Sequence, residues 1–444
     1  MILVAPPVDR VPYSVTCART GPAAAFALLV FLVGCFVSSW HGRFAGAIAA
    51  LSLVLMPRTF GHAHLAALET MVNLTCTAVV LYVADRWSDE AASVSWIAGL
   101  RVAAIAGLLF GLALLTKVQA ILLPVPVALW AFWRLRLRAL PLLAVSAFVA
   151  LAVFFVCWPY LWSAPVEHLK HYLGRTTDRA VLYVLYFGKS IADRDVPWHY
   201  PWLMFFTTVP IGLQVLAAFG LCGGKQPAWK SPRDVLVLAS MVFPLIVFSI
   251  PGIPVYDGER LFSNVFPLLS VFIGRGSDLV RGLLSSRFSA RAVAIALATF
   301  LACQAYGAIR MAPCWLSYYN LAIGGLWGAG RLGLETSYWG DSVTRRLLNE
   351  VAVQVPAGES VGVAPVLYDG QWEEVWMQAP WLRAQKLHPV PVDAKTSSMP
   401  RYVLLFMRPA YLPEELRGPL DERSIVASVR RQGVLLAALL DRER

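Results

Sequence analysis

Long apolar runs separated by short polar stretches fill the first two thirds of the chain. A bilayer core about 30 Å thick needs about 20 apolar residues per helix. Seven runs approach this length: Ala23–Trp40, Leu65–Ala84, Ile97–Leu115, Ala139–Trp158, Trp202–Cys222, Val235–Ile250 and Ala292–Ile309. Three shorter runs are typical of tilted, broken or re-entrant helices: Phe44–Met56, Val118–Trp133 and Leu261–Gly274. The pattern predicts a polytopic α-helical membrane protein with about ten spans.

Beyond Arg310 the apolar runs stop, and the residues have the composition of a soluble domain. Helical spacing covers Asp341–Val353. Alternating or continuous apolar stretches predict strands at Ser360–Val366, Leu387–Val392, Tyr402–Met407 and Ile425–Leu436. We therefore expect an N-terminal tail (1–21), a membrane domain (22–309) and a small C-terminal α/β domain (310–444).

Short basic loops orient the predicted spans, because Lys and Arg collect on the cytoplasmic side of membrane proteins. Three loops carry these residues: Arg134, Arg136 and Arg138; Lys225, Lys230 and Arg233; Arg275, Arg281, Arg287 and Arg291. Alternation then places six segments outside: the tail 1–21, Pro57–His64, Lys117, the loop 159–200, Pro251–Arg260 and the C-terminal domain. Within the loop 159–200, partly helical apolar spacing predicts a helix in the membrane interface, with Val166, Leu169, Leu173, Val181, Leu182 and Leu185.

Composition supports the membrane class, since 58% of the residues are hydrophobic and only 15% are charged, against about 25% charged in soluble domains. The formal net charge of +11 does not indicate nucleic acid. Basic segments interleaved with aromatic residues are not evident, and membrane lipid is the expected partner of the cations. Arginine outnumbers lysine, which is typical of GC-rich bacterial genomes, so we expect an integral protein of the bacterial cytoplasmic (inner) membrane.

Polar side chains concentrate at the predicted outer ends of the spans. The set comprises Arg58, His62, His64, Glu69, Lys117, His199, Tyr256, Asp257, Glu259 and Arg260. Cations can hold a phosphate or diphosphate at the membrane surface, and a carboxylate can act as general base toward an acceptor hydroxyl. Ionisable residues near the bilayer midplane, which ion-coupled transporters use, are scarce.

These residues also have ordinary structural explanations. His62 and His64 are more often interfacial histidines than ligands, and two histidines at i and i+2 make a poor helical metal pair. Lys117, between two spans, is suited to snorkelling. Glu69 lies one turn inside a predicted span, where an unpaired carboxylate is costly, so a functional and a structural role stay equally open. No metal site and no cofactor are predicted, and dependence on a divalent metal stays open.

Two glycine patterns are interpreted as structural. Residues Gly328–Gly333 match GxGxxG, but the strand that a dinucleotide fingerprint needs before it is missing, so we interpret the match as coincidental. Gly107 and Gly111 form a GxxxG pattern inside an apolar run, which predicts a helix-packing face.

Several stretches, taken in order, resemble one family. They are Pro57–Glu69, Leu115-Thr116-Lys117, Pro197–Pro201, Tyr256-Asp257-Gly258-Glu259-Arg260, Leu316–Asn320 with Gly324-Gly325, and Tyr338–Asp341. In this order the chain is similar to the protein O-mannosyltransferase-like and aminoarabinose-transferase-like branch of the GT-C glycosyltransferases. The similarity runs from about Pro22 to the C-terminus, and no single motif carries it.

The resemblance implies a multi-span enzyme that passes a sugar from a polyprenyl-phosphate donor to an acceptor lipid, glycan or protein outside the cytoplasm. Contacts to the donor phosphate would fall to Arg58, His62, His64, Lys117 and Arg260. Glu69 and Asp257 are the candidate catalytic carboxylates. The candidate acceptor or loop site consists of His199, Tyr256, Tyr319 and Asn320.

The N-terminus departs from the family pattern. Members begin with a span and a large first outer loop that carries the catalytic acid, whereas Met1 falls in what would be the tail of that loop. Asp9 is the only acid before the first predicted span. We expect a truncated gene model, with a degenerate member or a substitute carboxylate as alternatives. A transporter or lipid-handling protein without covalent chemistry is the alternative function, and an inactive scaffold is a third.

Overall fold

The computed structural model describes residues 15–444 except 90–95, 178–179, 225–226, 369, 394–395, 397 and 419. Most of the predicted tail, with Asp9, and Lys225 of the second basic loop lie outside the described residues. The chain divides into two units. The helical unit consists of Pro22–Leu182 and Ala192–Ile309, and the C-terminal unit consists of Met1–Gly21, Tyr183–Ile191 and Arg310–Arg444.

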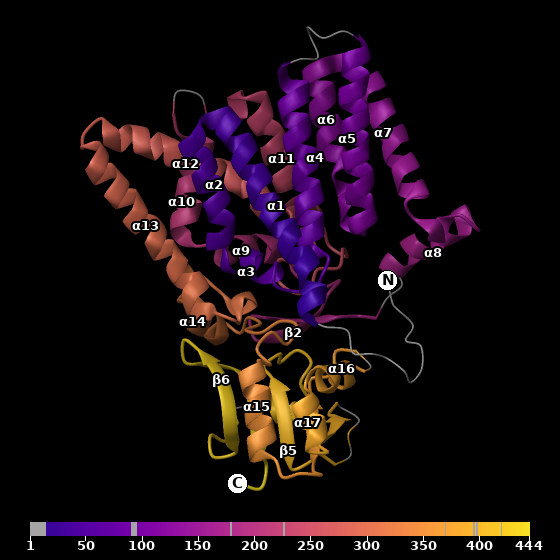
Figure 1. The fold of residues 1–444 in the computed structure, drawn as a ribbon, viewed down its shortest axis with the longest axis vertical. Helices are drawn as coiled ribbons and strands as arrows, with labels where there is room; N and C mark the ends of the chain where they lie inside the picture. Colours follow the sequence, from indigo (N-terminus) through magenta and orange to yellow (C-terminus); the bar gives the residue numbers. More distant parts are fainter. Residues whose placement is uncertain are drawn as a thin grey trace. The chain divides into compact units, whose positions relative to one another are not determined.

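Helices make up the helical unit (Figure 1). The N-terminal ones are α1 (Val15–His41), α2 (Arg43–Leu55), α3 (Pro57–His62), α4 (Glu69–Asp89), α5 (Trp96–Thr116), α6 (Pro124–Leu135), α7 (Ala139–Val156) and α8 (Pro165–Thr177). The later ones are α9 (Tyr200–Thr208), α10 (Ile211–Cys222), α11 (Pro232–Val247), α12 (Val265–Ser285) and α13 (Ala290–Met311). Short 3₁₀ turns lie between them: η1 (Val118–Leu122), η2 (Arg136–Arg138), η3 (Pro159–Leu161), η4 (Ala228–Lys230) and η5 (Arg260–Phe262).

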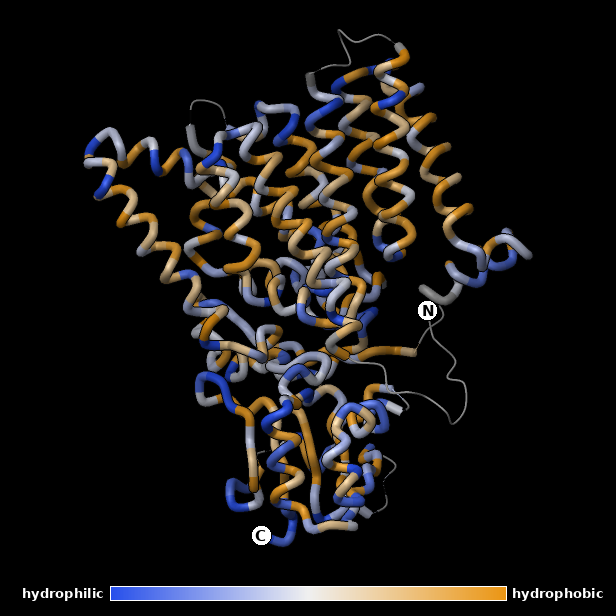
Figure 2. The backbone as a smooth tube through the Cα atoms, in the orientation of Figure 1, coloured by the Kyte–Doolittle hydropathy of each residue, from blue (hydrophilic) through white to orange (hydrophobic). Residues whose placement is uncertain are grey.

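Among the residues that the structure describes, four segments are long and apolar enough to cross a membrane: Cys17–His41, Ile97–Thr116, Val118–Val156 and Ala290–Met311. The bent pair α9 and α10 makes a fifth if it is counted as one span. The helices carry apolar residues along most of their length (Figure 2), and large apolar side chains such as Phe31, Phe148 and Ile295 are exposed. The chain is therefore an integral membrane protein, and the predicted count of about ten spans is not confirmed.

Glycines allow two helix pairs to approach closely. A Cβ atom on Gly107 would lie 2.5 Å from the Ser146 carbonyl oxygen of α7, and one on Gly111 would lie 2.6 Å from Val153 Cβ. The interpretation of Gly107 and Gly111 as a packing face is confirmed. Gly220 of α10 and Gly276 of α12 meet in the same way, because a Cβ on either would collide with the backbone of the other helix.

Several predicted boundaries are wrong for identifiable reasons. The run Trp202–Cys222 is two helices that meet at 107°. Pro210 has no N–H and forces the preceding Val209 into an extended conformation, which ends α9. Arg275 and Arg281 lie on α12, which continues to Ser285, and not in a loop.

The first half of the predicted interfacial segment is a helix, as the sequence predicts, and the second half is not. Val166, Leu169 and Leu173 lie on α8 and are exposed. The residues from Tyr183 onward instead form a hairpin of β1 (Tyr183–Tyr186) and β2 (Lys189–Ala192), because the β-branched and aromatic residues there pair across a tight turn.

The C-terminal unit is built on a five-stranded mixed sheet with the order β4-β3-β5-β7-β6. Its strands are β3 (Ser360–Ala364), β4 (His388–Pro391), β5 (Tyr402–Phe406), β6 (Ile425–Arg431) and β7 (Val434–Asp441). Strands β4 and β5 run parallel to β3, and β7 runs antiparallel to both β5 and β6. The remaining elements are η6 (Trp315–Ser317), η7 (Leu321–Ile323), α14 (Gly325–Arg331), α15 (Arg345–Gln354), α16 (Gln371–Gln378), α17 (Pro380–Ala384) and α18 (Glu414–Arg417).

The single predicted strand Ile425–Leu436 is wrong, since it contains a turn. Gln432 and Gly433 have φ values of 49° and 79°, the positive pair that a two-residue type I′ hairpin needs. The chain therefore reverses there, and β6 pairs with β7. The sequence Tyr183–Ile191 also belongs to this unit, where Leu185 N–H donates to Glu335 Oε2 at 3.1 Å and Gly188 N–H donates to the Gly333 carbonyl at 2.9 Å.

Candidate functional site

The short helix α3 presents two of the predicted site residues on one face. Met56 is extended and Pro57 occupies the first helical position, where its missing N–H costs nothing. Arg58 and His62 are four residues apart, so both side chains project to the same side of the helix. Both side chains are buried.

The loop before α12 reverses the chain at two consecutive residues. Asp257 and Gly258 have φ values of 58° and 67°, a conformation that is strained for most residues but open to glycine and tolerated by aspartate. The Gly258 N–H donates to the phenolic oxygen of Tyr200 at 3.1 Å, and Val255 N–H donates to the Asp193 carbonyl at 2.9 Å. After this turn, Glu259 pairs with α3 while the adjacent Arg260 pairs with α4.

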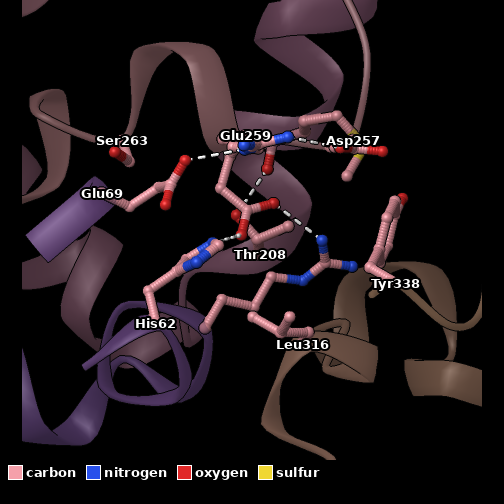
Figure 3. Close-up of polar contacts among 12 residues, drawn as sticks. His62, Glu69, Thr208, Asp257, Glu259, Ser263, Leu316 and Tyr338 are labelled. Carbon is pink, nitrogen blue, oxygen red and sulfur yellow. Dashed lines mark hydrogen bonds and ion pairs between the residues drawn. The ribbon is translucent and has the colours of Figure 1, made fainter. Parts of the chain in front are cut away.

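Glu259 is the centre of a buried group that also contains Arg58 and His62. Its Oε2 accepts a hydrogen bond from Arg58 Nη1 at 2.7 Å, and its Oε1 lies 3.6 Å from His62 Nε2. Figure 3 shows the His62 and Glu259 side chains pointing toward each other. The side chains of Arg58, His62 and Glu259 are only 3%, 5% and 3% exposed. Burial by itself would raise the pKa of Glu259, but the Arg58 guanidinium and His62 outweigh it and hold the pKa below its ordinary value.

Glu69 is the centre of a second, more open group (Figure 3). Its Oε1 accepts hydrogen bonds from Lys117 Nζ at 2.8 Å and from Arg260 Nε at 2.7 Å. Arg260 Nη1 also donates to Asp257 Oδ2 at 2.9 Å. Glu69 is 1% exposed, whereas its partners Lys117 and Arg260 are 14% and 24% exposed. The carboxylate is thus buried beneath two cations that reach the surface of the unit.

The two groups form one cluster, joined through the consecutive residues Glu259 and Arg260. Arg58, Lys117 and Arg260 supply three positive charges, and Glu69, Asp257 and Glu259 supply three negative charges. The sequence predicts these cations as donor-phosphate contacts and Glu69 and Asp257 as catalytic carboxylates, and in the structure the cations and carboxylates are paired with each other. Unlike charges must be paired where side chains are buried, because an uncompensated buried charge is costly.

The remaining predicted residues of the helical unit have other contacts. His64 is exposed, with its ring on Phe60 and its Nδ1 2.8 Å from the Phe60 carbonyl oxygen. His199 precedes α9 and contacts Trp198 edge to face. Tyr256 lies beside Arg260, whose guanidinium carbon is 5.9 Å from the ring centre.

Tyr319 and Asn320 lie in the C-terminal unit, where both have structural contacts. The Tyr319 hydroxyl donates to the Glu335 carbonyl at 2.8 Å, and Asn320 Oδ1 accepts from Ala322 N–H at 3.1 Å at the start of η7. Both side chains are buried. Their assignment to an acceptor site stays a prediction.

The sequence interpretation noted Glu259 among the polar residues but gave it no role. Three further residues were given no role in the site. Tyr200, which holds the loop at Gly258, was included only in the stretch Pro197–Pro201, and Ser263 Oγ donates to Asn73 Oδ1 at 2.8 Å. The adjacency of Glu259 to Asp257 and Arg260 was the available signal. A hydroxyl or amide within an apolar run gives no signal of that kind.

The cluster has the components of an anion site with nearby proton acceptors. Lysine and arginine donate charge-assisted hydrogen bonds to phosphate oxygens, and Glu69 stands at the N-terminus of the 21-residue helix α4, where the helix dipole favours negative charge. Among the described residues, no group of three or more His, Cys, Asp or Glu side chains is arranged to hold a metal ion.

Comparison with known proteins defines the fold. No family model matches the chain, and no curated protein matches it. Solved structures do match, and they show a membrane protein with a GT-C-like fold.

One of them is the crystal structure of ArnT from Cupriavidus metallidurans bound to undecaprenyl phosphate, with a TM-score of 0.50 and 17% identity over 95% of this chain and 83% of that chain. ArnT in the apo state, from the same organism, has a TM-score of 0.49 and 14% identity with the same coverage. ArnT is a GT-C family aminoarabinose transferase. At this identity the likeness concerns the fold alone, so the predicted GT-C-like fold is confirmed, and neither membership of the family nor the branch within it is decided.

Proposed function

We propose that the chain is a membrane glycosyltransferase that moves a sugar from a polyprenyl-phosphate donor to an acceptor outside the cytoplasm. The observation that carries the proposal is the group of Glu69, Lys117 and Arg260, two cations and a carboxylate at the end of a helix in a GT-C-like fold. The structural neighbour binds undecaprenyl phosphate, a lipid of the proposed donor class.

In the proposed reaction the acceptor hydroxyl oxygen attacks the anomeric carbon of the sugar. The bond from that carbon to the phosphate oxygen breaks, and polyprenyl phosphate leaves with the electron pair. A single displacement of this kind inverts the anomeric centre. Lys117 and Arg260 stabilise the negative charge that develops on the departing phosphate. The hydroxyl proton passes to a carboxylate, for which Asp257 and Glu69 are the candidates.

The residues predicted to contact the donor phosphate differ in their exposure. Lys117 and Arg260 reach the surface of the unit, so we assign the phosphate contact to them. Arg58 and His62 are enclosed around Glu259, so we assign them to holding the loop that carries Arg260. We place the protein in the bacterial inner membrane, with the C-terminal unit outside the cytoplasm.

The test is transfer of a radiolabelled sugar from a polyprenyl-phosphate donor by the purified protein in lipid nanodiscs. Lys117→Met should lower turnover by about 100-fold or more, the usual cost of removing one charge-stabilising group. Asp257→Asn should also lower turnover by about 100-fold or more, the usual cost of removing a general base. Asp234→Asn is the matched control, because Asp234 is a buried carboxylate paired with Arg275 at 2.7 Å outside the cluster.

Transfer that is equal in Lys117→Met and in the control contradicts the proposed site. Lipid flipping in liposomes that survives both Glu69→Ala and Arg260→Ala, together with no sugar transfer, supports a lipid-handling protein instead. The two assays therefore separate an enzyme from a transporter.

A further inference from the structure

Glu69 has the contacts of a bound anion. One carboxylate oxygen, Oε1, accepts charge-assisted hydrogen bonds from both Lys117 Nζ and Arg260 Nε, at 2.8 and 2.7 Å. These distances and donors are the ones that a phosphate oxygen would use. The second oxygen, Oε2, is buried and has no hydrogen-bond partner in the part of the chain that the structure describes.

The order of exposure decides which group an approaching anion meets. Lys117 and Arg260 reach the surface, and Glu69 lies beneath them at 1% exposure. A phosphate that approaches from the exposed side therefore meets the two cations first. Their charge is already matched by Glu69 and Asp257, so no net positive charge remains in this group to hold a further anion.

We infer that the Glu69 carboxylate occupies the position of the donor phosphate between Lys117 and Arg260, and that a phosphate must displace it to bind. This inference rests on the proposed function, whose donor supplies the phosphate. Two anions that share one pair of cations repel each other, and the repulsion is strong where water is largely excluded. Glu69 thus weakens binding of the phosphate group, whether that group belongs to a lipid or is free.

Displacement also changes Glu69 itself. A carboxylate that loses two cationic partners in a buried site binds a proton more readily. The residue that blocks the anion position is thereby converted into a better proton acceptor when the donor arrives. Glu69 then acts on donor affinity and on turnover in opposite directions, which a purely structural residue would not do.

The test measures the affinity of farnesyl phosphate, a short polyprenyl phosphate, and of inorganic phosphate by calorimetry on the purified full chain. Glu69→Gln keeps the shape of the side chain and one acceptor oxygen but removes the charge. It should tighten phosphate binding by about tenfold, equivalent to about 1.4 kcal/mol. Lys117→Met should weaken binding of the same ligands. If Glu69→Gln binds both ligands more tightly, the effect belongs to the phosphate group. If it binds only farnesyl phosphate more tightly, the effect belongs to the lipid-linked form.

Two controls accompany this variant. Asp234→Asn removes a comparable charge near the other end of α4. Asp234 lies 3.6 Å from His41, and the adjacent Trp40 donates from Nε1 to Asp85 Oδ1 of α4 at 2.9 Å. The 16 residues from Glu69 to Asp85 span about 24 Å of helix, so phosphate affinity should not change. Glu69→Asp keeps the charge but withdraws it from the cations, and should tighten binding by a smaller factor than Glu69→Gln.

Unchanged or weaker phosphate binding in folded Glu69→Gln overturns the inference. If Glu69→Gln does not fold, unchanged or weaker phosphate binding in Glu69→Asp overturns it instead. In the transfer assay Glu69→Gln should lower both the KM for the donor and kcat. Tighter phosphate binding without sugar transfer by the wild type would leave the inference standing and remove the proposed function. Sugar transfer by the wild type without tighter phosphate binding in Glu69→Gln would support the proposed function and overturn the inference.

Discussion

Glu69 and Glu259 are two buried carboxylates in one cluster, each held by two basic side chains, and they differ in what surrounds those basic groups. The partners of Glu259 are 3% and 5% exposed, whereas the partners of Glu69 are 14% and 24% exposed. The Glu259 group is therefore closed to any ligand, and the Glu69 group is open on its cationic side.

This difference shows that the type and pairing of residues do not by themselves define a binding site. Arg58 and Arg260 both donate to a glutamate at 2.7 Å, yet Arg58 is 3% exposed and Arg260 is 24% exposed. The closed group fixes the loop between α11 and α12 against α3, and the open group uses that fixed loop to present Arg260. We therefore expect damage to the first group to lower stability and damage to the second to change ligand binding.

The largest expected effect is the loss of stability in Arg58→Met. This change removes the guanidinium partner of the buried Glu259 and leaves His62 beside it. Breaking a buried ion pair costs about 3–5 kcal/mol of unfolding free energy. Lys117→Met leaves Glu69 paired with Arg260 and should cost less than half as much. Denaturant unfolding in detergent micelles measures both values. Equal losses in the two variants would show that exposure does not distinguish the groups.

The pH dependence of stability should follow the charge of Glu259. Its folded pKa lies below the ordinary value of 4.5, so the unfolded chain binds the proton more readily than the folded chain does. The contribution of the Glu259 charge is complete above about pH 4.5 and is lost as the pH falls through the folded pKa. The difference in Tm between the wild type and Glu259→Gln should be constant from about pH 7 to about pH 5 and shrink below about pH 4. A difference that already shrinks above pH 5 would contradict this assignment.

The smallest effect is expected for a pair in the C-terminal unit that has one exposed partner. Arg401 donates to both oxygens of Asp441 at 2.9 Å, and the Arg401 side chain is 43% exposed whereas the Asp441 side chain is 5% exposed. Because water screens the exposed guanidinium and Asp441 keeps Arg444 Nε at 3.8 Å, Arg401→Gln should lower the Tm by no more than about 2 °C. A shift as large as that of Arg58→Met would mean that bidentate geometry, rather than burial, sets the cost.

Much of the fold could be predicted from apolar periodicity. The strands Ser360–Ala364 and Tyr402–Phe406 begin where the sequence pattern predicts them, and α15 ends within one residue of its predicted end. The errors lie where one or two residues override a longer pattern. Pro210 breaks an apolar run of span length, and the Gln432-Gly433 turn divides an apolar stretch into two strands.

The candidate site was predictable in residue type and unpredictable in pairing. Arg58, His62, Glu69, Lys117, Asp257 and Arg260 were all singled out, and the structure brings them together. Glu259 was noted without a role, because its pairing with Arg58 spans 201 positions of sequence. Tyr200 was part of the stretch Pro197–Pro201 but was given no role, since the hydrogen bond that it accepts from Gly258 N–H depends on how α9 and the loop are packed.

The sequence by itself determined that this is a membrane protein whose C-terminal part contains strands and whose charged residues concentrate at the ends of its helices. Hydropathy and the periodicity of apolar residues are local properties. Only the tertiary structure decided that three cations meet three carboxylates there and that one pair is enclosed while the other is open. Exposure and long-range pairing depend on packing between helices that are distant in sequence. Glu69 and Glu259 thus share a residue type and differ in their environment.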